Sequence, residues 1–325
     1  MILFRIDYRF ESFACGFFLL FSVTSKTLEF IGQIPVAIVM KLQGNCFLFL
    51  IFVLASSFMG SAQTAPKAAP VQALQLSSKL MARDVPYRVV LPTEYRSSKE
   101  RYPVIYLLHG LAGHYDNWTD KTKIAQYAAS YKFIVVTPEG GDGWYTDSST
   151  ILNDKYEDYI IKELIPEIDA KFRTLVDRDH RMIAGLSMGG YGAIKFGLKY
   201  PDLFSLVGSF SGALDAPLRG QDSQFLRPSI ISVFGPEGSK ARKDNDIYGI
   251  LRDMSIDKLK NIPFIYFDCG TEDSFLQMNR DFDTLLIDKK IPHEFRELPG
   301  KHEWPYWDSQ VQEFLRIANK HVKTY

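Results

Sequence analysis

The sequence predicts an α/β fold, with a mostly parallel central sheet and helices on both of its faces. Short runs of consecutive apolar residues, such as Val104–Leu108 (VIYLL), are typical of strands that are buried on both sides. These runs alternate along the chain with segments of helical spacing, and that alternation favours parallel strands joined by crossover helices. Apolar residues make up 46% of the 325 residues, which is ample material for one large core.

The elements follow from apolar runs and from the Pro and Gly residues that bound them. Strands are expected at Arg88–Leu91, Val104–Leu108, Phe133–Thr137, Arg181–Gly185, Phe204–Phe210, Pro263–Asp268 and Glu294–Leu298. Helices are expected at Asp154–Phe172, from the turn after Gly185 to about Tyr200, at Leu276–Lys289 and at Ser309–Val322. Segment 213–261 mixes Pro, Gly and charge without a clear strand, so we interpret it as a small insertion above the sheet, a partial lid over the site.

The apolar run at 47–59 is shorter than the about 20 residues that a membrane-spanning helix needs. Lys41 precedes it and Gly60-Ser61-Ala62 follows it, which is the pattern of a secretory signal peptide cleaved after Ala62. We therefore expect a signal peptide over 40–62 and a secreted or periplasmic protein without stable membrane association after cleavage. The alternative is an N-terminal membrane anchor that uses Phe13–Val23 and the 47–59 run.

Two flanking segments complete the expected domain organisation. Because signal peptides begin a chain, residues 1–39 are interpreted as a mis-called extension upstream of Met40. Residues 63–72 are rich in Ala and Pro and are expected to form a flexible leader, so that the folded domain spans 73–325. Lys+Arg and Asp+Glu both number 38, and this neutral balance argues against nucleic acid or an anionic membrane as the main partner.

The strongest chemical signal is Gly185-Leu186-Ser187-Met188-Gly189, between a predicted strand and a predicted helix. In that context the pattern is typical of a nucleophile elbow, in which a sharp turn lifts a serine hydroxyl above the sheet. The glycines are needed because side chains there would clash with the neighbouring strand and helix. The start of the helix supplies a favourable field for developing negative charge.

A serine hydroxyl needs a base, and the expected base is His302, which follows the last predicted strand. Two other histidines are weaker candidates, since His293 lies at the wrong end of that strand and His321 lies in the terminal helix. In enzymes with a nucleophile elbow, the order along the chain is serine, acid, histidine. The acid should therefore follow the predicted strand Pro263–Asp268, which comes before the strand that leads to His302.

The segment after that strand, Asp268-Cys269-Gly270-Thr271-Glu272-Asp273, offers three carboxylates. Asp273 is favoured because it lies far enough beyond Gly270 to turn back toward the histidine, where it would fix the imidazole tautomer. Asp268 is the second candidate and Glu272 the third.

An oxyanion hole needs two backbone N–H groups. One is expected from Met188, directly after the serine, and the other from Leu111, in the loop after Val104–Leu108. His109 and His114 lie in the same loop but no Cys/His/Asp cluster with metal-ligand spacing accompanies them, so no metal is expected.

Six segments of the sequence resemble the esterase family of the α/β hydrolases, the group with esterase D (S-formylglutathione hydrolase), tributyrin esterases, feruloyl and acetylxylan esterases and mycolyltransferases. The resemblance covers about 76–320, nearly the whole expected domain. The matching segments are His109-Gly110-Leu111, Trp144–Asp147, Tyr156–Pro166, Gly185–Ala193, Cys269–Asp273 and Gly300–Trp304.

The resemblance implies the α/β-hydrolase fold, the triad Ser187, Asp273 and His302, and the oxyanion donors Leu111 and Met188. It also suggests that Trp144 and Tyr145 bind substrate near the acyl pocket, although a packed aromatic loop is an equally good interpretation of this pair.

The expected activity is that of a serine carboxylesterase acting on short-chain acyl or carbohydrate-linked esters through an acyl-enzyme, without a cofactor. The partner is then a small-molecule or carbohydrate ester. Alternatives are acyl transfer, an S-formylglutathione hydrolase-like thioesterase, for which a secretory signal is unsuited, and a catalytically inactive carbohydrate-binding member of the fold.

Overall fold

The computed structural model describes residues 40–42, 45–47, 68–219 and 226–322, and the chain divides into two units, Met1–Thr64 and Ala65–Tyr325. In the first unit the described residues form one antiparallel strand pair, β1 (Met40–Leu42) with β2 (Asn45–Phe47). The expected extension over 1–39, nearly all of the apolar run at 47–59 and the expected cleavage point lie outside the described residues. Among the described residues, no helix combines the length and apolar character needed to cross a bilayer.

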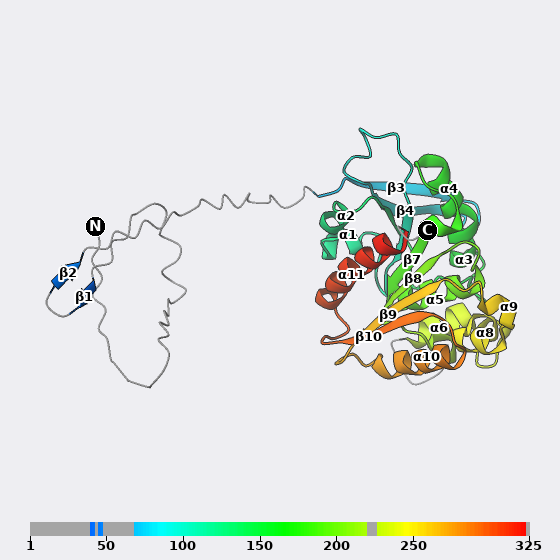
Figure 1. Ribbon diagram of the computed structural model, residues 1–325. Helices are drawn as coiled ribbons and strands as arrows, with labels where there is room; N and C mark the ends of the chain where they lie inside the picture. The colour runs from blue at the N-terminus through cyan, green and yellow to red at the C-terminus, as the bar shows by residue number, and fades with distance from the viewer. Residues whose placement is uncertain (1–39, 43–44, 48–67, 220–225, 323–325) are drawn as a thin grey trace, which may run out of the picture. The chain divides into compact units, whose positions relative to one another are not determined.

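The second unit is built around an eight-stranded sheet in the order β10-β9-β8-β7-β5-β6-β4-β3 (Figure 1). All neighbouring strands from β10 to β6 are parallel, while β4 is antiparallel to β6 and β3 is antiparallel to β4. The strands are β3 (Val71–Ser78), β4 (Arg83–Val90), β5 (Val104–Leu108), β6 (Ile134–Pro138), β7 (Arg181–Leu186), β8 (Leu206–Phe210), β9 (Phe264–Gly270) and β10 (His293–Leu298). The predicted α/β-hydrolase fold class is confirmed.

Helices cover both faces of this sheet (Figure 1). In β5 the side chains of Val104, Tyr106 and Leu108 join one apolar cluster, while Ile105 and Leu107 join the other, as the alternation of a strand requires. One face is covered by α1 (Asn117–Lys121), α2 (Ile124–Ala128) and α11 (Trp304–Val322). The other is covered by α4 (Ile165–Lys171), α5 (Met188–Lys199), α6 (Arg227–Phe234), α8 (Ile247–Asp253) and α10 (Leu276–Asp288).

The sheet begins earlier than the sequence predicted. Strand β3 starts at Val71, inside the expected leader over 63–72, and Ala69 just before it is buried, with its N–H donating to Ala125 O at 2.8 Å. Along β3 only Leu74 and Leu76 are apolar residues turned toward the core. Such a half-exposed edge strand gives a weaker apolar pattern than the central strands, and the domain boundary at 73 was therefore placed too late.

The expected helix over Asp154–Phe172 is divided in three: α3 (Tyr156–Asp158), the π-helical turn η2 (Tyr159–Leu164) and α4. The Ile165 N–H bonds to Ile160 O, five residues back, which is the π spacing. Pro166 follows directly, and because it has no N–H it cannot close an ordinary turn onto Lys162.

The described parts of segment 213–261 contain short helices joined by turns and no strand, and much of this segment packs onto the core, as buried Phe234, Ile247 and Leu251 show. Besides α6 and α8 it contains η4 (Ala216–Leu218), α7 (Lys240–Asn245) and α9 (Ile256–Leu259). Another short helix, η3 (Arg178–His180), lies directly before β7. Residues 220–225, inside the expected partial lid, lie outside the described residues.

Candidate active site

Ser187 lies in the turn between β7 and α5, with a backbone φ of 52° that non-glycine residues rarely adopt. The Ser187 N–H donates to Phe210 O at 2.9 Å, which ties the turn to β8. Two glycines allow the turn to be this tight. A Cβ on Gly185 would lie 2.5 Å from the Gly189 backbone, and a Cβ on Gly189 would lie 2.5 Å from Leu108 O. The local chain therefore has the geometry of a nucleophile elbow.

Three predicted residues that are distant in sequence form one hydrogen-bonded chain. The Ser187 Oγ lies 3.0 Å from His302 Nε2, and His302 Nδ1 lies 2.8 Å from Asp273 Oδ2. Because an ionised carboxylate can only accept, the proton between His302 and Asp273 lies on Nδ1, which leaves Nε2 free to accept from the serine hydroxyl. The contacts link an acid, a base and a hydroxyl in the order that nucleophilic catalysis requires.

The Asp273 carboxylate is held in its ionised form. Its side chain is fully buried, and Oδ1 accepts the Phe275 N–H at 2.9 Å. Burial alone would raise the pKa of Asp273, but the hydrogen bonds from His302 and from the Phe275 N–H outweigh it and lower the pKa. At neutral pH a negative charge therefore lies behind His302, where it stabilises an imidazolium.

Two aromatic rings contact the imidazole of His302. The ring centroids of Phe275 and Trp307 lie 4.6 Å and 4.9 Å from that of His302, and both ring planes are steeply inclined to the imidazole. The His302 side chain nevertheless stays 31% exposed. The ring is thus fixed in orientation while Nε2 remains accessible from the pocket.

The loops that carry the acid and the base are bonded to each other. They follow β9 and β10, which are neighbouring parallel strands, so both loops start at the same edge of the sheet. The Thr271 N–H donates to Leu298 O at 2.8 Å, and the Glu272 N–H donates to Gly300 O at 2.9 Å. A Cβ on Gly270 would lie 2.3 Å from Gly300 O, so this close approach requires glycine.

The other two carboxylates of the acid segment have different partners. Asp268, at the end of β9, is fully buried and accepts the Tyr306 O–H at 2.9 Å, and burial raises its pKa to about 7. Glu272 is exposed, with its carboxylate 3.7 Å from Lys301 Nζ. Only Asp273 reaches His302.

The other two histidines also lie away from the serine. His293 Nε2 lies 2.8 Å from Asp283 Oδ1. His293 is the first residue of β10, whereas His302 follows the last residue of that strand. His321 is in the last turn of α11, and burial lowers its pKa. The structure brings together the predicted serine, acid and histidine and leaves these alternatives outside.

The loop after β5 packs against the elbow: a Cβ on Gly110 would lie 3.4 Å from Ser187 Cβ. His109 is buried; its Nδ1 lies 2.8 Å from Gly110 O and its Nε2 accepts the Gly140 N–H at 2.9 Å. Nδ1 therefore carries the proton, and the Gly113 N–H also donates to Gly110 O, at 3.1 Å. In a trans peptide the N–H points opposite to the C=O, so these bonds fix the direction of the Leu111 N–H.

Met188, the second expected donor, is the first residue of α5, where backbone N–H groups have no acceptor within the helix. Leu111 and Ser187 line the same pocket, and Met188 is the residue after the nucleophile, fully buried. Both residues thus belong to segments that adjoin Ser187, and their role as oxyanion donors stays a prediction.

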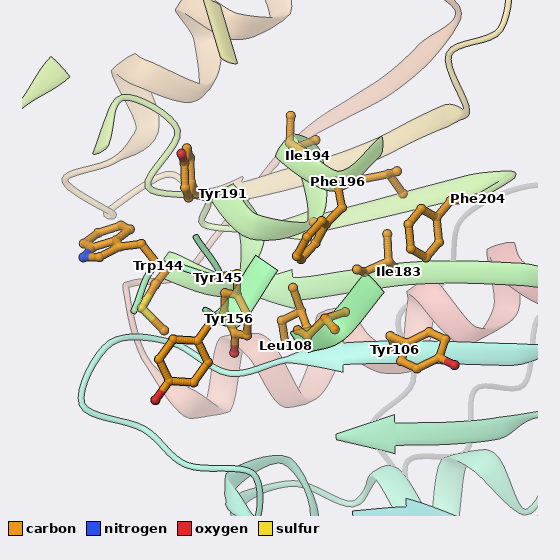
Figure 2. Close-up of a cluster of buried hydrophobic side chains, with 14 of the residues drawn as sticks. Tyr106, Leu108, Trp144, Tyr145, Tyr156, Ile183, Tyr191, Ile194, Phe196 and Phe204 are labelled. Carbon is orange, nitrogen blue, oxygen red and sulfur yellow. The ribbon is translucent and has the colours of Figure 1, made fainter. Parts of the chain in front are cut away.

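Trp144 and Tyr145 belong to a packed aromatic loop and do not line the pocket of Ser187. Figure 2 shows both within the buried cluster on the α5 side of the sheet. The Trp144 ring lies 6.0 Å from Tyr191, its Nε1 donates to Ser229 Oγ at 3.1 Å, and the Tyr145 O–H donates to His109 O at 3.0 Å. The expectation of substrate contact is thus corrected, because both side chains turn into the core, where the Tyr145 hydroxyl supports the loop of His109.

The pocket in front of Ser187 has a volume of about 610 Å³, which falls within the usual range of small-molecule sites. Its walls come from the loop after β5, from α1, from both ends of the undescribed segment 220–225, and from the acid and base loops. The residues that sequence analysis did not predict are Asn117, Lys121, Arg219, Leu226, Phe275, Glu303, Trp304 and Trp307. Phe275 and Trp307 lie close in sequence to Asp273 and His302, and that proximity was the one signal that could have identified them.

Over the described ranges, no group of three or more His, Cys, Asp and Glu side chains could hold a metal ion. His109 and His114 each approach a different oxygen of Glu139, at 3.3 and 3.4 Å. Burial raises the pKa of Glu139, but the Gly141 N–H donates to its Oε1 at 2.7 Å and the Tyr115 N–H donates to its Oε2 at 3.2 Å, and these hydrogen bonds lower the pKa. We interpret His109, His114 and Glu139 as a structural network that supports the loop after β5.

Comparison with known proteins agrees with this geometry. The model of the family described as "Putative esterase" matches residues 78–317. An acetyl esterase of Caldicellulosiruptor saccharolyticus is 28% identical over 77% of this chain and 98% of its own length. An esterase of Mycobacterium tuberculosis is 36% identical over 66% of this chain, a match that spans 51% of that longer protein.

A solved structure of a fluorophosphonate-binding serine hydrolase of Staphylococcus aureus is similar, with a TM-score of 0.70 and 27% identity. The similarity covers 78% of this chain and 99% of that one. Fold, site geometry and family match lead to one conclusion: the chain belongs to the esterase family of the α/β hydrolases and is a carboxylic ester hydrolase.

Proposed function

We propose that the protein is a secreted serine carboxylesterase that hydrolyses short-chain acyl or carbohydrate-linked esters through Ser187, His302 and Asp273. One observation carries the proposal. An unbroken chain of hydrogen bonds runs from the buried Asp273 carboxylate through His302 to the Ser187 hydroxyl, at 2.8 and 3.0 Å, and that hydroxyl faces a pocket of about 610 Å³.

In the acylation step, His302 Nε2 takes the proton of the Ser187 hydroxyl as the oxygen attacks the ester carbonyl. The carbonyl oxygen gains negative charge, which the N–H groups of Leu111 and Met188 stabilise. Asp273 stabilises the imidazolium that forms. The imidazolium then gives its proton to the departing alcohol, and the acyl group remains on Ser187.

In the second step, water takes the place of the alcohol. His302 Nε2 accepts a proton from the water as it attacks the acyl-enzyme, and the proton returns to Ser187 Oγ when the carboxylic acid leaves. Because His302 is partly exposed on the pocket side, a water molecule can reach Nε2 once the alcohol has left. No cofactor takes part in either step.

Two observations support the substrate class. The similar acetyl esterase acts, by its name, on a short acyl group, and it is covered over nearly its whole length. The pocket combines apolar walls from Leu186, Phe275 and Trp307 with polar side chains, as binding sites for small polar molecules commonly do.

Acyl transfer and thioester hydrolysis remain the second proposal, because both use the same serine, base and oxyanion donors. An alcohol that binds where the attacking water binds converts hydrolysis into transfer. Similarity to known esterases does not discriminate between the acceptors, so the products have to be measured.

Export is proposed on the sequence pattern at 40–62 alone. Mass spectrometry of exported protein tests it. A mature N-terminus near Gln63 supports export, and full-length protein retained in the cell contradicts it.

The activity is tested with p-nitrophenyl acetate, tributyrin, acetylated xylan and methyl ferulate on wild-type protein and on Ser187→Ala. We expect turnover of short esters by the wild type, and a loss of about 10⁴-fold or more in the variant at unchanged melting temperature. Ser97→Ala, an exposed serine, is the matched control. Turnover by Ser187→Ala close to that of the wild type would refute the proposal. Product analysis with added alcohol separates hydrolysis from transfer.

A further inference from the structure

The wall of the pocket contains a continuous row of side-chain contacts with His302 in its middle and a cation at each end. Toward one end, Phe275 lies 4.6 Å from His302, and the Arg219 guanidinium lies 5.1 Å from the Phe275 ring. Toward the other end, Trp307 lies 4.9 Å from His302 and Trp304 lies 5.4 Å from Trp307. The Lys121 ammonium there lies 5.1 Å from the Trp304 ring. All six residues line the pocket of Ser187.

The two cations differ in their partners. Arg219 Nε donates to Asp215 Oδ1 at 2.6 Å, so its charge is compensated within the protein. Among the described residues, Lys121 makes no ion pair. Its neighbour Asp120 is instead paired with Arg88 of β4. The Lys121 end of the row therefore presents to the pocket a positive charge that has no ion-pair partner among the described residues.

Helix α1, which carries Lys121, is anchored next to the loop after β5. Trp118 is buried, and its Nε1 donates to Leu108 O at 2.9 Å. Leu108 directly precedes the loop that carries Leu111, which we call the oxyanion loop. Asn117 and Lys121 are four residues apart, so they share one face of the helix, and both line the pocket. The oxyanion loop and Lys121 are thus parts of one anchored unit.

We propose that the natural substrate is an ester that carries a negatively charged group, such as a carboxylate or a phosphate, which binds Lys121 at the Trp304 end of the pocket. This inference rests on the proposed esterase function and names the chemistry of its substrate. Attraction between the anion and the Lys121 ammonium would hold the ester along the row of rings, with its carbonyl carbon at Ser187.

Glu303 supplies an internal comparison, because its exposed side chain lines the same pocket and is not ion-paired among the described residues. A carboxylate there repels an anionic substrate. Removing the charge of Lys121 and removing the charge of Glu303 should therefore change the preference for anionic esters in opposite directions.

The test compares matched neutral and anionic esters at low ionic strength. Phenyl acetate is paired with 4-acetoxybenzoate, which places the charge on the alcohol, and p-nitrophenyl hexanoate is paired with mono-p-nitrophenyl adipate, which places it on the acyl group. The quantity measured is the ratio of kcat/KM for the anionic ester to that for the neutral ester. Intrinsic differences in ester reactivity cancel when this ratio is compared between variants.

For at least one of the two pairs, we expect Lys121→Gln to lower the ratio about two- to fivefold, as partly exposed charge pairs do. Glu303→Gln should raise it, and 0.5 M NaCl should reduce both effects. Lys123→Gln, an exposed lysine outside the pocket wall, should leave it unchanged.

Two negative results are distinguishable. If the wild type hydrolyses the neutral esters in a Ser187-dependent manner, but neither ratio responds to Lys121→Gln, the anionic substrate is refuted and the esterase function stands. If the wild type hydrolyses none of the four esters, the proposed function itself fails, and this inference fails with it.

Discussion

Two ion-pair networks lie near opposite ends of helix α5, and they differ in access to the pocket. We call the Asp273–His302 network open, because it reaches the pocket, and the Lys195–Glu157 network closed, because it is buried. At the start of the helix, the Asp273–His302 pair leads to the Ser187 hydroxyl in an accessible pocket. Near the other end, Lys195 is fully buried and its three donors are all used, by Tyr145 O, Thr146 Oγ1 and Glu157 Oε2, each at 2.7 Å. The first network has a nitrogen and a hydroxyl that can react, and the second has none.

The electrostatics of the Lys195 network fit a structural role. Burial lowers the pKa of Lys195 to about 8, although Glu157 opposes that shift. Burial raises the pKa of Glu157, but Lys195 and Lys199 outweigh it and lower the pKa to about 2. A perturbed pKa is thus an ambiguous signal of function. The Ser187 site differs because the carboxyl with the shifted pKa, Asp273, is linked to a histidine and a serine that a substrate can reach from the pocket.

The largest predicted effect is on the open network. Asp273→Asn should lower turnover per folded molecule about 10²–10⁴-fold, because the amide favours the wrong tautomer of His302. Thermal stability and turnover are measured together. Glu272→Gln, the exposed neighbouring carboxylate, is the matched control and should cost little. If Asp268→Asn loses more turnover than Asp273→Asn, the acid has been misassigned.

Mutation of the closed network should lower stability and leave turnover nearly unchanged. Among the described residues, Lys195→Met leaves the buried Glu157 carboxylate with Lys199 as its one remaining cationic partner, and it should lower the free energy of unfolding by about 3–5 kcal/mol. Turnover per folded molecule should stay within about threefold of the wild type. The double variant Lys195→Met with Glu157→Gln should recover part of the lost stability, because no uncompensated charge is then buried. Loss of turnover in a fully folded Lys195→Met protein would contradict the division between the two networks.

Asp268 should make the stability of the folded protein depend on pH. Its folded-state pKa of about 7 lies above the ordinary value of a carboxyl, so between about pH 4 and pH 7 the unfolded chain is ionised while the folded protein keeps the proton. Unfolding then releases a proton, and Asp268 makes stability fall as pH rises, by at most about 1.4 kcal/mol per pH unit. In denaturant titrations from pH 4 to pH 8, Asp268→Asn should lose this contribution. An unchanged pH profile would show that the carboxyl is already ionised in the folded protein.

The smallest predicted effect concerns the link between the networks. Tyr145 bonds to Lys195 through its carbonyl and to His109 through its hydroxyl. Tyr145→Phe removes one buried hydrogen bond and should cost about 0.5–1.5 kcal/mol, with turnover within about threefold of the wild type. Tyr102→Phe is the control, since its buried hydroxyl has no hydrogen-bond partner among the described residues. A larger loss of turnover in Tyr145→Phe would make this residue part of the catalytic apparatus.

Much of the site could be predicted because its signals are local. The elbow depends on glycines within two residues of Ser187, and the acid and base follow consecutive strands of the sheet. Parallel strands bring their carboxyl ends to one edge, so the position of a residue after a strand was enough to bring Asp273 and His302 together. The fold class followed from the same alternation of strands and helices.

What could not be predicted depends on side-chain direction and on contacts between distant segments. Sequence placed Trp144 and Tyr145 near the pocket, but both have a left-handed backbone, with φ of 50° and 49°, and turn into the core. Lys121 meets Trp304 only because α1 and α11 cover the same face of the sheet. Such contacts depend on helix packing, which spacing along the chain does not encode.

The most direct test of the central claim is the reaction of the native protein with a fluorophosphonate, followed by peptide mapping. The account predicts a single phosphonylated residue, Ser187, complete loss of esterase activity, and labelling that is much slower in His302→Ala because the base is gone. Labelling of another serine, or full activity in protein whose Ser187 is modified, would contradict it.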